Sequence, residues 1–366
     1  MAIGLIEAFL SIEDPRVERN KRHQLIDIIV LTISAVISDA EGWESIEDFG
    51  YNQLDWLRKW IALENGVPSH DCIARVISRL PVSSMTECFM RWVNSVAQLT
   101  DGEVVAIDGK TARHSYDTKN NRGAIHMVSA WANQAGISLG QVKTDDKSNE
   151  ITAIPNLLDL LEIKGCIVTI DAMGCQTEIA AKIVEKQADY VLAVKGNQKL
   201  THEAIIDYFE TAKADNNNTL NCDEQVDCGH GRIEVRRCYL SRCLDTLPDS
   251  KRWVNLKSIA MVETERTIGD KTSQRYYITS LTSVACFAQT VRAHWGVENS
   301  LHWVLDVTFG EDDCRIRKGY SAENFNIIRQ LSLNLIKKHP AKKSIKRKRM
   351  LAALDNKFRE SLLFST

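Results

Sequence analysis

The stretch CIVTIDAMGCQ at 166–176 places a carboxylate directly behind a run of strand-forming residues. Residues 167–170 suit a strand that is covered on both faces. Asp171 then falls at the carboxyl edge of the sheet, where ligands of α/β proteins usually bind. The other interpretation is that Asp171 caps a helix or a turn. The stretch alone predicts a buried strand and leaves both roles of Asp171 open.

A second stretch, VVAIDGKTARHS at 104–115, repeats this pattern. Apolar residues lead into Asp108, and Gly109 and the cations Lys110 and Arg113 follow it. If the two strands are neighbours in one sheet, Asp108 meets Asp171 at one crevice, where their mutual repulsion requires a compensating cation. Mg²⁺ suits such a site because it prefers a few carboxylates together with water and phosphate oxygens. Two such ions support an in-line phosphoryl displacement, so the pair predicts a metal-dependent site for phosphate chemistry.

A third acid is expected from the helical stretch HWGVENSLHWVLD that begins at His294. Helical spacing places His294, Glu298 and His302 along one side. A glutamate among bulky apolar and aromatic neighbours is costly to bury without a partner such as a metal ion, which makes Glu298 the first candidate. Asp306 and the acidic run 311–313 remain alternatives. The two histidines are more often packing or hydrogen-bonding residues than ligands.

The spacing of apolar residues changes near residue 100, which predicts two structural parts: a helical part and a part that contains a sheet. Residues 15–100 have apolar residues at spacings of three and four, and helices are expected at 23–40, 44–63, 69–79 and 84–98. From 103 onward three strands follow one another, and strands then alternate with helices, which is typical of a mixed α/β sheet. Residues 224–283 are strand-rich, as an insertion or a sheet extension, and helices return from about 286.

The charge of the chain is small in total but unevenly distributed. The 366 residues carry a net charge of −2, yet residues 315–349 carry +11 and residues 1–314 carry −13. The run KKSIKRKR at 342–349 is either a solvated surface segment or part of a basic end that captures a polyanion.

Other features narrow the class of protein. The ten cysteines form no CxxC pair and no evenly spaced framework, which favours reduced thiols in a cytoplasmic protein and argues against a structural zinc site. The first residues, MAIGLIEAFL, lack the basic region of a signal peptide. The apolar run 25–38 is too short to span a bilayer and contains Asp27, so we expect a core helix and no membrane contact.

These stretches, with several others, resemble the DDE transposases of bacterial insertion sequences, on the branch of the H-repeat-associated proteins. The matching segments cover nearly the whole chain: NGVPSHD at 65–71, AIDGKTARHS at 106–115, TIDAMGCQ at 169–176, YVLAVKGNQ at 190–198, GHGRIEVR at 229–236, HWGVENSLHWVLDVTFGEDDCRIR at 294–317 and NFNIIRQLSLNLIK at 324–337. The resemblance implies a ribonuclease-H-like catalytic domain at 101–340, interrupted by a β-rich insertion at about 220–285. A helical transposase-associated domain at 1–100 would precede it, and a basic tail at 341–366 would follow.

The resemblance also implies a function: an enzyme that binds the ends of its own element, cuts phosphodiester bonds and joins the freed 3′-OH to target DNA. The catalytic and metal-binding acids would be Asp108, Asp171 and Glu298, with Mg²⁺ or Mn²⁺ as the cation and a homo-oligomer as the species that acts on DNA. Further residues would contact DNA through cationic or amide groups: Lys110, Arg113, Lys195, Asn197, Gln198, Arg315, Arg317 and Lys318. Two alternatives remain, a nuclease that only hydrolyses DNA and a DNA-binding remnant without catalytic activity.

The chain departs from the family pattern around the glutamate. Neighbouring branches have Tyr, Arg and Lys at the places where this chain has Val291, His294 and Leu305, so the DNA-clamping role of that signature does not carry over. Trp295 and Trp303 offer stacking surfaces for an unpaired base. A tryptophan on an amphipathic helix is more often a core residue, and we expect at least one of the two in the core.

Overall fold

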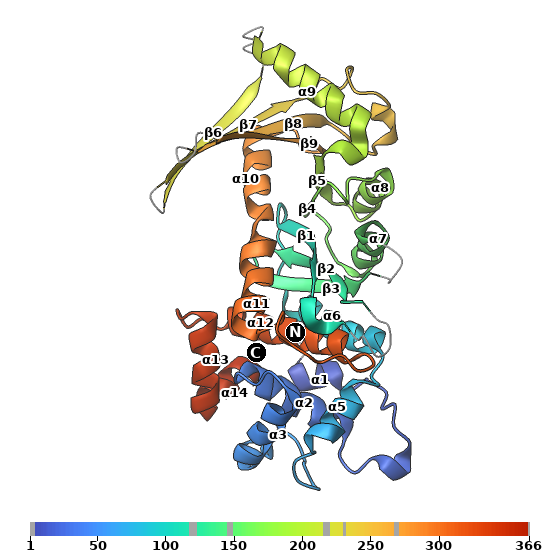
Figure 1. The fold of residues 1–366 in the computed structure, drawn as a ribbon, viewed down its shortest axis with the longest axis vertical. Coiled ribbons are helices and arrows are strands. Elements are labelled where there is room, and N and C mark those ends of the chain that lie inside the picture. The colour runs from blue at the N-terminus through green and yellow to red at the C-terminus, as the bar shows by residue number, and fades with distance from the viewer. Residues whose placement is uncertain are drawn as a thin grey trace.

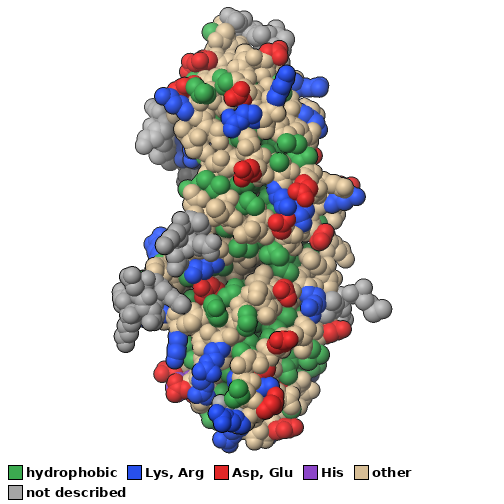
Figure 2. Space-filling model, turned by 90° about the vertical axis from the view of Figure 1, so that its right-hand side faces the viewer, with side chains coloured by type: hydrophobic (Ala, Val, Ile, Leu, Met, Phe, Trp, Pro, Cys, Tyr) green, Lys and Arg blue, Asp and Glu red, His purple; other side chains and the backbone are tan. Residues whose placement is uncertain are grey.

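The computed structural model describes residues 4–116, 123–144, 149–214, 220–229, 232–266 and 271–364. The molecule is elongated: a helical end, a central mixed sheet and an outer end of strands and helix follow one another along its long axis (Figure 1). On one long face, Lys and Arg side chains are interspersed with Asp and Glu side chains (Figure 2). Within the described ranges, nine strands form one continuous sheet in the order β3-β2-β1-β4-β5-β9-β8-β7-β6.

The central half of the sheet contains β1 Val104–Thr111, β2 His126–Ala132, β3 Ile137–Lys143, β4 Ile167–Ile170 and β5 Asp189–Val194. The first three strands pair antiparallel, whereas β4 lies parallel between β1 and β5. A short turn joins β2 to β3, which suits antiparallel pairing, and a helix joins β4 to β5, which suits parallel pairing. The expected mixed sheet is therefore confirmed.

The strand-rich part of the sequence extends this same sheet. Its strands are β6 Asn221–Gly229, β7 Arg232–Ser241, β8 Ser258–Arg266 and β9 Lys271–Thr279. β9 pairs antiparallel with β5, with Thr279 opposite Val191. Helix α9, Lys199–Ala214, packs on β8 and β9 and covers this outer half (Figure 1).

Helices cover both faces of the sheet. α7 Glu150–Leu160 and α8 Thr177–Glu185 lie on one side of the central strands, and α10 Val284–His294 lies on the other (Figure 1). Phe287 of α10 packs into a buried cluster with residues of the central and outer strands. α12 Ser321–Lys338 contacts both β3 and the helical end, so it joins the two parts of the molecule.

The helical end contains α1 Leu5–Phe9, α2 Leu25–Ile37, α3 Trp43–Asn52, α4 Leu54–Leu57, α5 His70–Ile77 and α6 Val82–Val96. The helix expected at 44–63 breaks at Gln53 into α3 and α4. α5 begins as expected, with the Ser69 hydroxyl accepting a hydrogen bond from the Cys72 amide at 3.3 Å. α2 is buried along nearly its whole length. No helix in the described part of the chain is long and apolar enough to cross a membrane.

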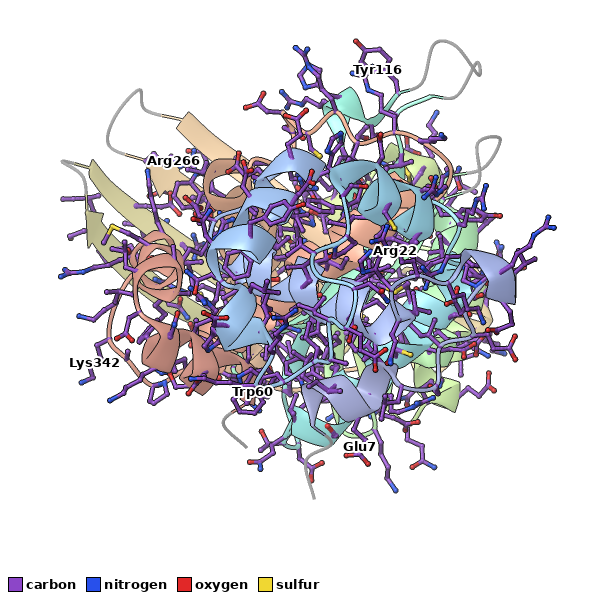
Figure 3. The ribbon with its side chains drawn as sticks, turned by 90° about the horizontal axis from the view of Figure 1, so that it is seen from below. Glu7, Arg22, Trp60, Tyr116, Arg266 and Lys342 are labelled. Carbon is purple, nitrogen blue, oxygen red and sulfur yellow. The ribbon has the colours of Figure 1, made fainter. Side chains whose placement is uncertain are left out.

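The described part of the segment 341–366 is not the tail that the sequence suggested. It forms α13 Ile345–Leu354 and α14 Asn356–Phe364, which both contact α2. Within the run 342–349, four cations are exposed: Lys342, Lys343, Lys346 and Arg347. Figure 3, which looks onto the helical end, shows Lys342 at its edge.

Two other cations of the same run are buried. The ammonium of Lys348 donates to the carbonyl oxygens of Ile336 at 2.9 Å and His339 at 2.8 Å. Arg349 is 1% exposed and donates to the carbonyl of Val36 at 3.0 Å. Carbonyls in the last turn of a helix lack helical partners and attract cations. A run that looked solvated therefore closes the ends of α12 and α2.

Candidate active site at the edge of the central strands

Asp108 and Asp171 come from adjacent parallel strands. β1 pairs with β4 so that Ile107 lies opposite Ile170, and each aspartate is the next residue along the chain. β1 continues to Thr111 by pairing with β2, whereas β4 ends at Ile170. The two aspartates thus occupy neighbouring positions at one edge of the sheet.

Glu298 and His302, from the segment that follows α10, lie close to Asp108. A π-helical turn, Glu298–His302, follows α10 and leads into α11 Trp303–Phe309. The Nδ1 atom of His302 lies 3.4 Å from Oε2 of Glu298 and 3.6 Å from Oδ2 of Asp108. One ligand atom from each of the three residues lies within 4.8 Å of the others. π-Helical turns are rare in proteins overall, but those that occur often lie at functional sites.

Glu298 is not buried, although its apolar neighbours in sequence suggested burial. Its side chain is 55% exposed. Trp295 and Trp303 are 45% and 57% exposed, so the expectation that at least one of them lies in the core is wrong. The apolar residues of this segment that pack inward are Val297, Leu301, Val304 and Leu305. Glu298 and the two indoles are therefore exposed, and Glu298 lies near Asp108.

Asp171 is held in a turn directly behind β4. Its Oδ1 atom accepts a hydrogen bond from the amide of Met173 at 3.0 Å, as aspartates in turns commonly do. Asp171 lies outside the group that Asp108 forms with the π-helical turn, but its charge acts on Asp108. The turn bond fixes the direction in which this carboxylate points.

Asn197 and Gln198 hold the loop that follows Asp171. The side-chain amide of Asn197 donates to the carbonyl of Ala172 at 2.6 Å, and that of Gln198 donates to the carbonyl of Cys175 at 2.9 Å. Both amides, which the sequence suggested as DNA contacts, are engaged within the protein. They couple the end of β5 to the loop behind β4.

The surroundings of Asp108 raise the affinity of its carboxylate for protons. Burial, the largest cause, and the charges of nearby carboxylates raise the pKa of Asp108 to about 7; these carboxylates are Glu150, Asp171 and Glu298. Burial lowers the pKa of His302 to about 4, so its imidazole is neutral near pH 7, the form that binds metal ions. Its buried Nε2 atom has no hydrogen-bond partner among the residues that the structure describes. Crowded carboxylates and a neutral imidazole are a donor set that fits a divalent cation.

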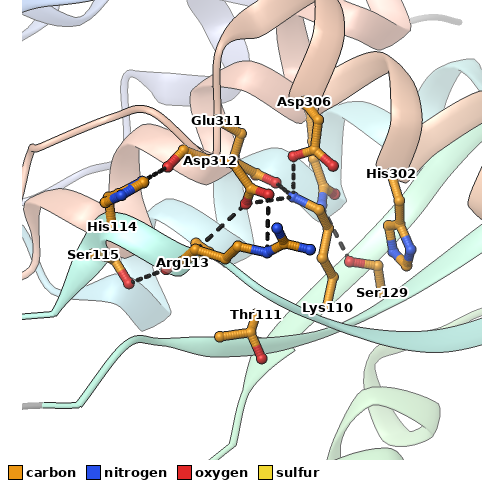
Figure 4. Close-up of polar contacts among 12 residues, drawn as sticks. Lys110, Thr111, Arg113, His114, Ser115, Ser129, His302, Asp306, Glu311 and Asp312 are labelled. Atoms are coloured by element: carbon orange, nitrogen blue, oxygen red, sulfur yellow. Dashed lines mark hydrogen bonds and ion pairs between the residues drawn. The ribbon is translucent and has the colours of Figure 1, made fainter.

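Lys110 binds the acids that were the alternatives to Glu298 (Figure 4). Its ammonium lies 2.5 Å from Oδ1 of Asp306 and 3.5 Å from Oδ1 of Asp312, and it also contacts Glu311. The side chains of Lys110 and Glu311 are 15% and 2% exposed. Lys110 therefore ties β1 to α11 and the loop behind it. Arg113, by contrast, is 79% exposed and lies 3.4 Å from Asp312.

Arg315, Arg317 and Lys318 line a groove of about 850 Å³ between this loop and the helical end. The starts of α3 and α5 form its other wall, and helix N-termini attract anions. Glu41 and Glu44 also line this groove. We refer to it as the 315–318 groove.

Lys195 lies at the end of β5 and lines a pocket of about 180 Å³ beside Asp171. Arg275 and Trp295 form part of its wall, and the Arg275 guanidinium lies 5.0 Å from the centre of the Trp295 ring. Cationic groups beside an exposed aromatic ring suit contacts with phosphate and with a base.

The sequence patterns did not identify Glu150 and His126 as residues that lie near Asp108. Glu150 begins α7 behind the cap residue Asn149, where an acid is ordinary because it complements the helix dipole. Its Oε1 atom lies 2.8 Å from Nε2 of His126 on β2. Only the folded sheet brings this pair beside Gly109, the residue after Asp108.

The two parts of the fold match two family models. Residues 6–93 match the family described as DDE_Tnp_1-associated, and residues 99–335 match the Transposase DDE domain. The chain is 43% identical to "Putative transposase YncI" of Escherichia coli O157:H7, over 99% of this chain and 95% of that protein. It is 44% identical to "H repeat-associated putative transposase YhhI" of Escherichia coli strain K12, over 98% of this chain and 97% of that protein. The chain therefore belongs to the DDE transposases, with the H-repeat-associated proteins among its relatives.

Proposed function

We propose that Asp108, Asp171 and Glu298 are the acids with which this transposase cuts DNA at the ends of its element and joins the freed 3′-OH to target DNA. The observation that carries this proposal is the meeting of the Glu298 turn with Asp108, next to Asp171 on the adjacent strand. The strand order β3-β2-β1-β4-β5, antiparallel in its first half and parallel in its second, supports a ribonuclease-H-like core for this half of the sheet.

The same residues would hold Mg²⁺ or Mn²⁺. The carboxylates of Asp108 and Glu298 suit both ions, whereas the imidazole of His302 suits Mn²⁺ better than Mg²⁺. A bound divalent cation would stabilise the charge that develops on the attacking and leaving oxygens. The chain itself contributes orientation, because a turn fixes Asp171 and Lys110 fixes the helix behind Glu298.

Two cationic surfaces would hold the DNA beside this centre. One is the pocket of Lys195, Arg275 and Trp295, which opens next to Asp171. The other is the 315–318 groove, which suits a phosphate backbone because phosphate contacts position DNA without reading its sequence. An element has two ends, and the described part of each chain contains one such centre, so two copies would act together on the DNA.

A strand-transfer assay with DNA that carries the ends of the element tests the activity. We expect a joined product in the presence of Mg²⁺ or Mn²⁺. Cut DNA without a joined product would identify a nuclease that only hydrolyses. DNA that is bound but uncut would identify a catalytically silent remnant.

The variant Asp171→Asn tests the assignment of the acids. It keeps the size of the side chain but removes the charge, so we expect cutting and joining to be lost while DNA binding and folding persist. Asparagine forms turns and caps about as well as aspartate. Strand transfer close to that of the wild type would therefore show that Asp171 serves only the turn behind β4.

A further inference from the structure

A fourth carboxylate lies beside the proposed centre. Glu150, in the first turn of α7, has a side chain that is only 14% exposed, and its Oε1 atom contacts Nε2 of His126 at 2.8 Å. The other ring nitrogen of His126 lies 2.8 Å from the hydroxyl of Thr111 on β1. His126, which itself contacts Thr111, therefore holds the Glu150 carboxylate near the end of β1, although surface acids in a first helical turn usually point into water.

Gly109 makes this approach possible. A side chain at position 109 would overlap Oε1 of Glu150 and come within 2.5 Å of Nε2 of His126. The Glu150 carboxylate thus occupies the space that a Cβ atom would take on the residue directly after Asp108.

We propose that Glu150 is an auxiliary acid of the catalytic centre, held by His126, whose charge beside Asp108 strengthens the binding of the divalent cation. The inference rests on the proposed function, because it assumes that the centre at Asp108 holds such a cation. Glu150 acts through its charge and needs no direct bond to the ion. Outer carboxylates that support a metal site typically contribute about ten- to a hundredfold to its affinity.

An alternative is that Glu150 only anchors the start of α7 to β2 through His126. The two roles differ in what they require. A structural anchor requires the hydrogen bond to His126, which a glutamine can also make. A charge beside Asp108 requires the carboxylate itself.

The test measures Mn²⁺ binding to the full chain by electron paramagnetic resonance, with thermal unfolding as the control for folding. We expect Glu150→Gln to raise the Kd for Mn²⁺ by about tenfold at an unchanged Tm. Glu150→Asp keeps the charge and should recover part of this loss. Glu203→Gln, on the exposed side of α9, makes the same change away from the site and should bind Mn²⁺ like the wild type.

Strand transfer gives a second readout. Glu150→Gln should require more Mg²⁺ for half-maximal activity and should approach the wild-type rate at saturating Mg²⁺. A structural defect would not be corrected by raising the Mg²⁺ concentration.

Asp108→Asn separates failure of the inference from failure of the proposed function. If Asp108→Asn loses Mn²⁺ binding but Glu150→Gln does not, the centre stands and Glu150 is no part of it. If Asp108→Asn binds Mn²⁺ like the wild type, the proposed centre itself is wrong. A lower Tm with equal loss of Mn²⁺ binding in Glu150→Gln and Glu150→Asp would establish the anchoring role and overturn the inference.

Discussion

The two cations that follow Asp108 in the sequence end in different surroundings. Lys110 is held by Asp306, Glu311 and Asp312, whereas Arg113 is exposed and pairs with Asp312 at the surface. Both were suggested as DNA contacts, but a lysine that neutralises a buried glutamate cannot reach a phosphate without leaving that glutamate unpaired. Lys110 is better placed to position α11, and with it the turn that carries Glu298.

This difference predicts unlike effects for Lys110→Met and Arg113→Met. Lys110→Met leaves Glu311 buried without its cation, so we expect a loss of about 3 kcal/mol of stability and at least a tenfold slower strand transfer. DNA affinity and its salt dependence, measured on the folded variant below its Tm, should not change. Arg113→Met should fold like the wild type and, where it contacts a phosphate, reduce the salt slope by about 1.

The opposite result for Lys110 would also be informative. An unchanged Tm together with a smaller salt slope in Lys110→Met would show that the lysine leaves the acidic residues and contacts DNA.

For single residues, the sequence could predict a place in the site where that place depends on neighbours along the chain. Asp108 and Asp171 follow strand-forming runs, and that pattern is local. The position of Glu150 depends on the packing of α7 against β2 and on the missing side chain of Gly109, which no local pattern contains. The exposure of Glu298 was also beyond prediction, because it depends on which side of the helix faces the sheet.

Among the elements, the π-helical turn Glu298–His302 has the most direct bearing on the site. A regular helix would put His294, Glu298 and His302 on one side. In the structure His294 faces Thr169 on β4, with Nδ1 2.9 Å from the threonine hydroxyl, while the π-helical turn faces Asp108. The extra residue of a π-helical turn thus changes the phase of the helix between its contact with β4 and its approach to Asp108.

Deletion of Asn299 tests the importance of this phase. Removing one residue should convert the turn into a regular helix and rotate α11 by about 100° relative to α10. Glu298 could then not lie near Asp108 while Asp306 keeps its ion pair with Lys110, so we expect strand transfer to be lost. Asn299 is exposed, and Asn299→Ala is the matched control that should keep activity near the wild-type level. An active deletion variant would show that the π-helical turn has no role in the site.

The elements themselves were partly predictable. Periodicity located the strands of the central sheet and most helices of the helical end, because those signals lie within single segments. Pairing of β5 with β9 joins residues about ninety positions apart and makes the insertion an extension of the sheet, which periodicity alone left open. α13 was missed because its cations resemble a solvated run, although two of them close helix ends through main-chain carbonyls.

Over the whole molecule, some of the cations near the C-terminal end are buried in the fold and others are exposed. Residues 315–349 carry a net charge of +11. Lys348 and Arg349 are buried in the fold, whereas four neighbouring cations of the run 342–349 are exposed. Removal of the whole run would therefore disturb the helical end, and a deletion cannot measure what the exposed cations contribute to DNA binding.

Replacing only the exposed cations makes that measurement. The fourfold variant changes Lys342, Lys343, Lys346 and Arg347 to Gln. Each neutralised phosphate releases counterions, so we expect weaker binding to non-specific DNA and a salt slope reduced by up to about 3 to 4, at an unchanged Tm. Arg349→Met is the matched control: it removes one buried cation, so it should lower the Tm while leaving the salt slope of the folded protein as it was. If the fourfold variant bound DNA with the wild-type affinity and slope, this surface would be a solvated face of the helical end. The charge that attracts DNA would then have to lie elsewhere, as in the 315–318 groove and the pocket of Lys195.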